Sequence, residues 1–112
     1  MEESLVMHAV LNADLKMRPG KAAAQVGHVV QLIIENILTG IYEGTINSKD
    51  YETYLAWKKA PTKIILKTTE QNLQNLTKLG IPFYDEIDGE SKLICVGFFP
   101  GKKVDSTKYQ LF

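Results

Sequence analysis

The chain has 112 residues, which is enough for one domain with a real core but not for two, so we expect a single domain over residues 1–112. Hydrophobic residues make up 45% and charged residues 23%, proportions that argue against disorder. Thirteen basic and thirteen acidic residues cancel, so only a local patch could attract nucleic acid. The single cysteine excludes a disulfide framework. The acidic start (MEES) does not resemble a signal peptide, and every apolar stretch is shorter than a membrane span, so we expect a cytosolic location.

The first half of the chain predicts one strand and two helices. The expected elements are a strand over residues 4–11, a loop over 12–20, a helix from 21 to about 38 and a helix over 49–59. The strand (SLVMHAVL) is almost continuously apolar, which is typical of burial on both faces. Apolar residues in the first helix recur every three or four positions, and Pro19 can open it. Gly40 and Gly44 break that pattern, and Ser48 can cap the second helix.

The second half predicts a strand, a helix and a strand pair. The expected elements are a strand over residues 62–68, a helix from Thr68 or Thr69 to Gly80, strands over 81–87 and 92–99, and a tail without a clear period from 102. The buried side of the helix is expected to hold Leu73, Leu76 and Leu79. Asp88 and Gly89 signal a hairpin turn between the last two strands. The order β-α-α-β-α-β-β predicts an α/β protein, a three-layer α/β/α sandwich with a mixed four-stranded sheet.

Three polar residues near the start of the first helix are candidates for a site. Lys21, Gln25 and His28 are spaced four and three apart, so they share one helix face, away from the apolar stripe. A lysine in the first turn opposes the helix dipole, and the same helix end attracts anions, so Lys21 fits a phosphate or carboxylate site. A solvated surface lysine is the simpler interpretation, and spacing alone leaves both open.

The residues around this helix resemble the signature of a known family. Residues 14–17 (DLKM) and then 20–28 (GKAAAQVGH) are similar to the lysine-dependent, archaeal and eukaryotic class of peptidyl-tRNA hydrolase. Further similarity lies at Trp57, the strand 63–67 (KIILK), the segment 73–81, Val104 with Asp105, and Leu111 with Phe112. The resemblance extends over nearly the whole chain, and the element order above is compatible with the fold that it implies.

The resemblance implies hydrolysis of the ester that joins a peptide to the terminal ribose of tRNA. Such a site must hold phosphate, orient a water molecule at an ester carbonyl and stabilise an oxyanion. By family position, Lys21 would be the essential lysine, and Asp88, eight residues past Gly80, the catalytic aspartate. Ser91 is a candidate for a further catalytic hydroxyl. The expected substrate-binding residues are Lys16, Arg18, Gln25 and His28.

The segment after Asp88 is shorter than the family pattern. Residues 88–92 (DGESK) run directly into an apolar strand, so about eight residues of the active-site loop are absent. Asp88 and Gly89 are equally interpretable as a tight hairpin turn. Two other functions therefore stay open, a catalytically inactive homologue that binds RNA or protein, and hydrolysis of a different small ester or amide through Lys21.

The remaining polar and aromatic candidates have simpler interpretations. His8 lies in an apolar strand and is expected to be a hydrogen-bonded structural histidine. Cys95, between two apolar neighbours, is expected in the core. Tyr84 and Phe99 could stack on bases of single-stranded RNA, although core burial is favoured for Phe99.

Partners follow from charge and from the resemblance. Binding of tRNA phosphates needs a local patch, for which the chain offers, besides the cations of the first helix, Lys58, Lys59, Lys63 and Lys67. We expect no cofactor and no metal, because the chain contains none of the usual ligand motifs. Members of the family are commonly homodimers, so self-association is a further expectation.

Overall fold

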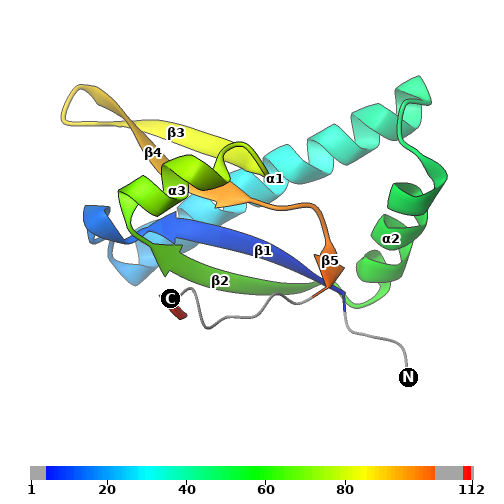
Figure 1. Ribbon diagram of the computed structural model, residues 1–112, viewed down its shortest axis with the longest axis horizontal. Coiled ribbons are helices and arrows are strands. Elements are labelled where there is room, and N and C mark those ends of the chain that lie inside the picture. The colour runs from blue at the N-terminus through cyan, green and yellow to red at the C-terminus, as the bar shows by residue number, and fades with distance from the viewer. Residues whose placement is uncertain (1–4, 103–109, 112) are drawn as a thin grey trace.

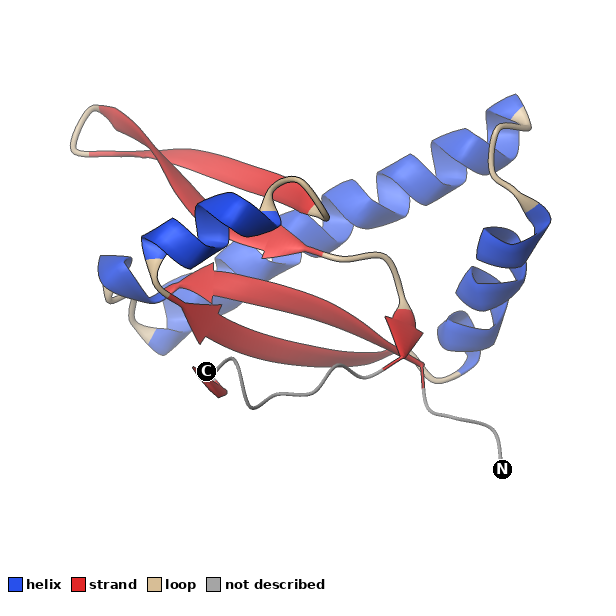
Figure 2. Ribbon diagram, in the orientation of Figure 1, coloured by secondary structure: helices blue, strands red, loops and turns tan. Residues whose placement is uncertain are grey.

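The computed structural model describes residues 5–102 and 110–111. Its elements, in chain order, are β1 (Leu5–Asn12), the 3-10 helix η1 (Ala13–Leu15), α1 (Pro19–Glu43), α2 (Ser48–Lys59), β2 (Thr62–Thr68), α3 (Glu70–Leu76), β3 (Ile81–Ile87), β4 (Glu90–Gly97), β5 (Gly101–Lys102) and β6 (Gln110–Leu111) (Figure 1). The expected order of helices and long strands is therefore confirmed. Figure 2 shows a single sheet with helices on both sides of it.

The four long strands form a mixed sheet in the order β3-β4-β1-β2. β1 pairs in parallel with β2 and antiparallel with β4, while β3 and β4 form an antiparallel hairpin. The expected count of four strands is too low, because β5 pairs with β1 and β6 pairs with β2. Strands of two residues have no periodicity that a sequence pattern can reveal.

β1 lies inside the sheet, and its composition follows from that position. Seven of its eight residues are buried. Ala9 and Leu11 pack against α1 on one face, whereas Val10 packs on the other face with Leu73 of α3. A strand that is covered on both faces needs apolar side chains on both, so the interpretation of the SLVMHAVL segment is confirmed.

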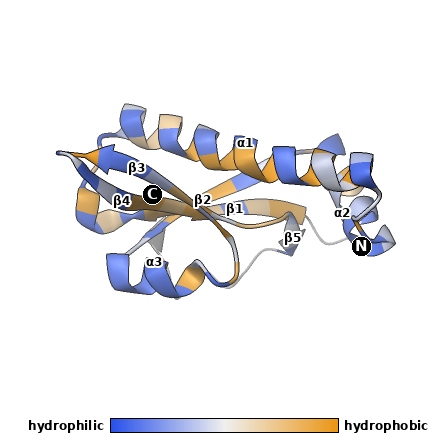
Figure 3. Cartoon of the chain, turned by 90° about the horizontal axis from the view of Figure 1, so that it is seen from above, coloured by the Kyte–Doolittle hydropathy of each residue, from blue (hydrophilic) through white to orange (hydrophobic). Residues whose placement is uncertain are grey.

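The helices form the outer layers of an α/β/α sandwich. α1 packs on one face of the sheet, and α2 extends that layer through Tyr54 and Trp57, which join Met7 of β1 and Ile33 of α1 in the core. α3 packs on the opposite face (Figure 3). The three-layer arrangement is thus confirmed.

Two helices end at residues other than those expected. α1 continues past Gly40 to Glu43 and ends at Gly44, whose left-handed backbone (φ 71°) lets its N–H reach the carbonyls of Gly40 and Ile41. α3 ends earlier, at Leu76, and the chain reaches Gly80 through a turn. Leu79 therefore lies outside the helix and is 77% exposed, so its expected burial is wrong.

The β3–β4 hairpin has the turn that the sequence predicted. Asp88 (φ 52°) and Gly89 (φ 79°) both adopt left-handed backbone conformations between Ile87 and Glu90. β4 begins at Glu90, two residues earlier than expected, because pairing continues to the turn. The family-like residues Val104, Asp105 and Phe112 lie outside the described residues.

Cys95 is a core residue, as expected, and its burial leads to a testable prediction. The thiol is fully buried, its Sγ lies 3.7 Å from the backbone oxygen of Gln25, and burial raises its pKa to about 12. We expect native protein to resist iodoacetamide at about pH 8, and protein unfolded in guanidinium to react, as measured by mass spectrometry. Because the folded pKa exceeds the ordinary value of 9.0, the thiol's contribution to stability is complete below pH 9.0 and is lost as the pH rises toward 12. Rapid alkylation of the native protein would contradict this burial.

Candidate functional site

The first turns of α1 lie beside β3, and this contact assembles a polar cluster. Gln25 is 5% exposed, and its Nε2 donates a hydrogen bond of 3.2 Å to Oδ2 of Asp85 on β3. Asp85 itself is exposed, so the hydrogen bond joins a fixed amide to a carboxylate at the surface. The carbonyl oxygen of the same amide, Oε1, is buried without a hydrogen-bond partner in the described part of the chain.

Asp85 also receives the electrostatic influence of the two other candidates on this helix face. The hydrogen bond from Gln25 and the backbone N–H of Glu86 hold the pKa of the Asp85 carboxyl below its ordinary value of 3.8, and the charges of Lys21 and His28 lower it further. Lys21, Gln25 and His28 therefore share one flank of α1, as their spacing predicted, and Asp85 faces them. At neutral pH this carboxylate is ionised, and the positive charge of Lys21 favours that ionisation.

His28 is held by an aromatic contact. Its ring stacks on the ring of Phe83, with centroids 5.1 Å apart and an angle of 25° between the planes. Phe83 and Asp85 alternate along β3 and both lie on the α1 side. The imidazole of His28 thus packs against the same strand that supplies the carboxylate.

The amino end of α1 is positively charged, exposed and without a side-chain cap. Arg18 occupies the N-cap position without a side-chain cap, Pro19 follows at the first helical position, and the first turn contains no acidic residue. Lys16, Arg18 and Lys21 are all exposed here. Unpaired backbone N–H groups and the helix dipole add to these three charges, which gives an end suited to binding anions.

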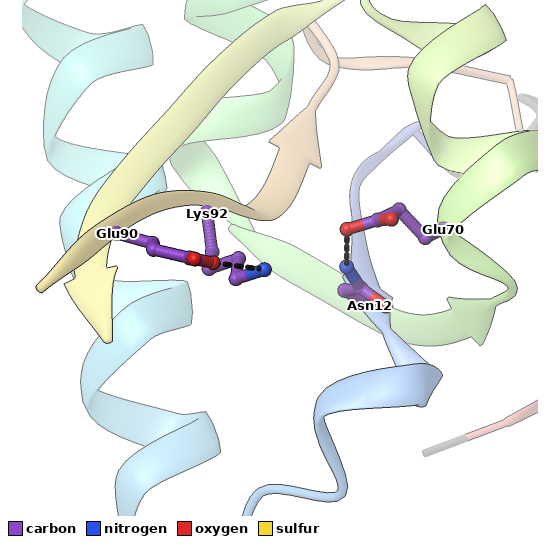
Figure 4. Close-up of polar contacts among 4 residues, drawn as sticks. All are labelled: Asn12, Glu70, Glu90 and Lys92. Atoms are coloured by element: carbon purple, nitrogen blue, oxygen red, sulfur yellow. Dashed lines mark hydrogen bonds and ion pairs between the residues drawn. The ribbon is translucent and has the colours of Figure 1, made fainter. Parts of the chain in front are cut away.

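A hydrogen-bond network around the buried Asn12 holds the loop that precedes α1. Asn12 is 1% exposed, and its Nδ2 donates to the backbone oxygen of Leu93 at 3.0 Å and to Glu70 at 3.4 Å (Figure 4). Its Oδ1 accepts from the N–H of Asp14, and Asp14 in turn accepts from the N–H of Glu70. These bonds tie the loop to α3 and β4. They therefore fix the backbone that leads to Lys16, which itself adopts a left-handed conformation (φ 50°).

Asp88 and Ser91 lie in the hairpin at the end of β3, and both are exposed. Neither side chain forms a hydrogen bond or an ion pair within residues 5–102 and 110–111. The nearest described ion pair joins Lys92 to Glu90 at 2.9 Å, and it lowers the pKa of Glu90 and raises that of Lys92 (Figure 4). The catalytic roles expected for Asp88 and Ser91 stay predictions, and Asp85 of β3 is a competing candidate for the catalytic carboxylate.

Asp85 is a candidate site residue that the sequence patterns did not predict. The available signal was strand alternation, since Ile81, Phe83, Asp85 and Ile87 lie on one face of β3. That pattern indicates which residues share a face, but not that this face meets the Lys21 flank of α1. The pairing of helix and strand is a tertiary contact.

The other candidates lie away from this cluster. His8 is buried in β1 and lines a cavity of about 270 Å³ on the α3 side. Tyr84 is 49% exposed and Phe99 is 37% exposed, so the expected core burial of Phe99 is wrong. Phe99 lies outside the strands, in the loop between β4 and β5. No group of three or more His, Cys, Asp or Glu side chains suited to a metal occurs among the described residues.

Fold and site together define an α/β sandwich protein with a lysine, a carboxylate and a cationic helix end on one exposed surface. The chain belongs to the family described as peptidyl-tRNA hydrolase PTH2, whose model matches residues 5–109. No curated protein and no solved structure gave a significant match. None of the described helices has the length and hydropathy needed to cross a membrane.

Proposed function

We propose that the protein hydrolyses the ester between peptide and tRNA, with Lys21 and Asp85 as the catalytic residues. The single observation that supports this most strongly is the position of the ionised Asp85 carboxylate against the Lys21 flank of α1. Asp85 would accept a hydrogen bond from water and orient it toward the ester carbonyl. The Lys21 ammonium would stabilise the negative charge that develops on the carbonyl oxygen.

The neighbouring residues have supporting roles in this mechanism. Gln25 is a positioning residue, because its buried amide fixes the carboxylate of Asp85. His28, stacked on Phe83, would contact the substrate from the same flank. The oxygen of water forms a bond to the peptide acyl carbon, and the bond between that carbon and the ribose oxygen breaks. One proton of water ends on the released ribose hydroxyl and the other leaves with the peptide acid.

The test is release of tRNA from purified peptidyl-tRNA by the wild type and by Lys21→Ala. We expect Lys21→Ala to lower kcat by about 100-fold or more, because an oxyanion donor is lost. Lys78→Ala, which removes an exposed lysine after α3 on the other face, is the matched control and should retain activity. Equal rates for wild type and Lys21→Ala would contradict the mechanism.

The inactive homologue is the competing function, and the two-residue hairpin turn at Asp88 and Gly89 is the observation in its favour. It predicts tRNA binding without release, whereas the enzyme predicts both. The family supports a role in translation, and we propose that the protein acts in the cytoplasm. The homodimer stays a prediction, which sedimentation would test.

A further inference from the structure

Although the net charge is zero, basic and acidic residues are concentrated on different strands of the sheet. Residues 57–69, which include β2, contain Lys58, Lys59, Lys63 and Lys67 and no acidic residue. Residues 81–91, which include β3, contain Asp85, Glu86, Asp88 and Glu90 and no basic residue. Because β2 and β3 lie on opposite sides of the β4-β1 pair, the two charged segments are far apart in the sheet (Figure 1).

The lysines of β2 share the α1 side of the sheet. Ile65 packs against the core cluster that α1 covers, and strand alternation places Lys63 and Lys67 on the same face as Ile65. Lys63 lies 5.5 Å from the ring centroid of Trp57 in α2. Neither Lys63 nor Lys67 forms an ion pair with any carboxylate in the described ranges, 5–102 and 110–111, so both charges are available to a partner.

A groove lies between α1 and Ile65, the residue of β2 that Lys63 and Lys67 flank along the strand. It has a volume of about 340 Å³, and its lining is apolar: Leu11, Pro19, Ala22, Ala23, Val26 and Ile65. The small side chains of Ala22 and Ala23 leave space between the helix and β2. The groove reaches Pro19, so it opens at the cationic amino end of α1, beside η1, which contacts β2.

We propose that the single-stranded 3′ end of tRNA lies in this groove, with its phosphates on Lys63 and Lys67, and passes around the amino end of α1 to Lys21. The inference rests on the proposed function and adds the path of the substrate. An apolar groove with cations beside it matches the chemistry of a single strand, which has apolar faces on its bases and a negative charge on each phosphate. The acidic β3–β4 hairpin lies at the opposite flank of α1 and repels phosphates. The tRNA strand therefore has one favourable direction of approach, along the β2 side.

The test is binding of deacylated tRNA, which needs no hydrolysis and therefore distinguishes failure of this inference from failure of the proposed activity. Affinity is measured by fluorescence anisotropy over a range of salt concentrations. We expect Lys63→Gln/Lys67→Gln to weaken binding about tenfold and to reduce the slope of log K against log salt by about 0.7 for each lysine. Where the wild type hydrolyses peptidyl-tRNA, the double variant should raise KM and leave kcat unchanged.

The matched control is Lys49→Gln/Lys78→Gln, which removes the same charge from exposed positions at the start of α2 and after α3. It should retain wild-type affinity and salt slope. Because Lys63 packs on Trp57, thermal unfolding is measured for each variant, and Lys67→Gln alone tests the path without that contact. Equal weakening in control and test variants, or absence of tRNA binding by the wild type, would overturn the inference.

Discussion

Asp85→Asn is expected to lower kcat for release of tRNA from peptidyl-tRNA by about 100-fold or more. Asparagine has the same shape and can still accept the hydrogen bond from Gln25, but it lacks the negative charge that orients water. Since Asp85 is exposed, the substitution should not alter folding, and single-turnover kinetics at saturating enzyme measure the chemical step directly.

Asp88→Asn is the matched comparison, because it makes the same change three residues further along the chain. At the exposed hairpin turn it is expected to change kcat by less than about fivefold. The reverse result, with Asp88→Asn inactive and Asp85→Asn active, would assign catalysis to the carboxylate that the family position indicates. Equal and large losses would mean that the two carboxylates act together.

Gly80→Ala is expected to destabilise the fold by about 3 kcal/mol and to lower Tm by roughly 10 °C. A Cβ at this position would lie 2.6 Å from the backbone oxygen of Gly97 and 2.7 Å from Cγ1 of Val96. The contact with Gly97 is with backbone in the sheet, which cannot move aside as the end of a flexible side chain can. Gly80 is therefore required by close packing of the turn after α3 against β4, and thermal and guanidinium unfolding measure the effect.

Gly27→Ala is the control for this prediction. Nothing lies within 4 Å of a Cβ at Gly27, which is in the middle of α1. Alanine there should stabilise the protein by about 0.5–1 kcal/mol, since glycine loses more backbone freedom in a helix. A Gly80→Ala protein as stable as the wild type would show that the turn can relax away from β4.

Much of the fold follows from local patterns in the chain. The apolar run of β1, the stripe of α1 and the Asp88-Gly89 turn each predicted the element that occurs there. Lys21, Gln25 and His28 were also placed correctly on one helix face. These predictions succeed because helix and strand periods decide which side chains share a face, and those periods are properties of a short segment.

Other features depended on contacts between distant segments. Leu79 lies in the turn after α3 and Phe99 lies in the loop between β4 and β5, and the exposure of both depends on tertiary packing that no local pattern specifies. β5 and β6 exist only because β1 and β2 offer them pairing partners.

The sequence by itself determined the family signature, the three-layer α/β class and the polar face of α1, because each depends on residue types and their spacing along the chain. Only the tertiary structure decided that Asp85 is the carboxylate on which the charge of Lys21 acts, and that the lysines of β2 and the acids of β3 are separated by the two strands between them. The physical reason is that both depend on the strand order, which sets β3 against one flank of α1 and places β2, with the apolar groove, at the other flank. Strand order is fixed by long-range packing, and a residue's neighbours along the chain do not specify it.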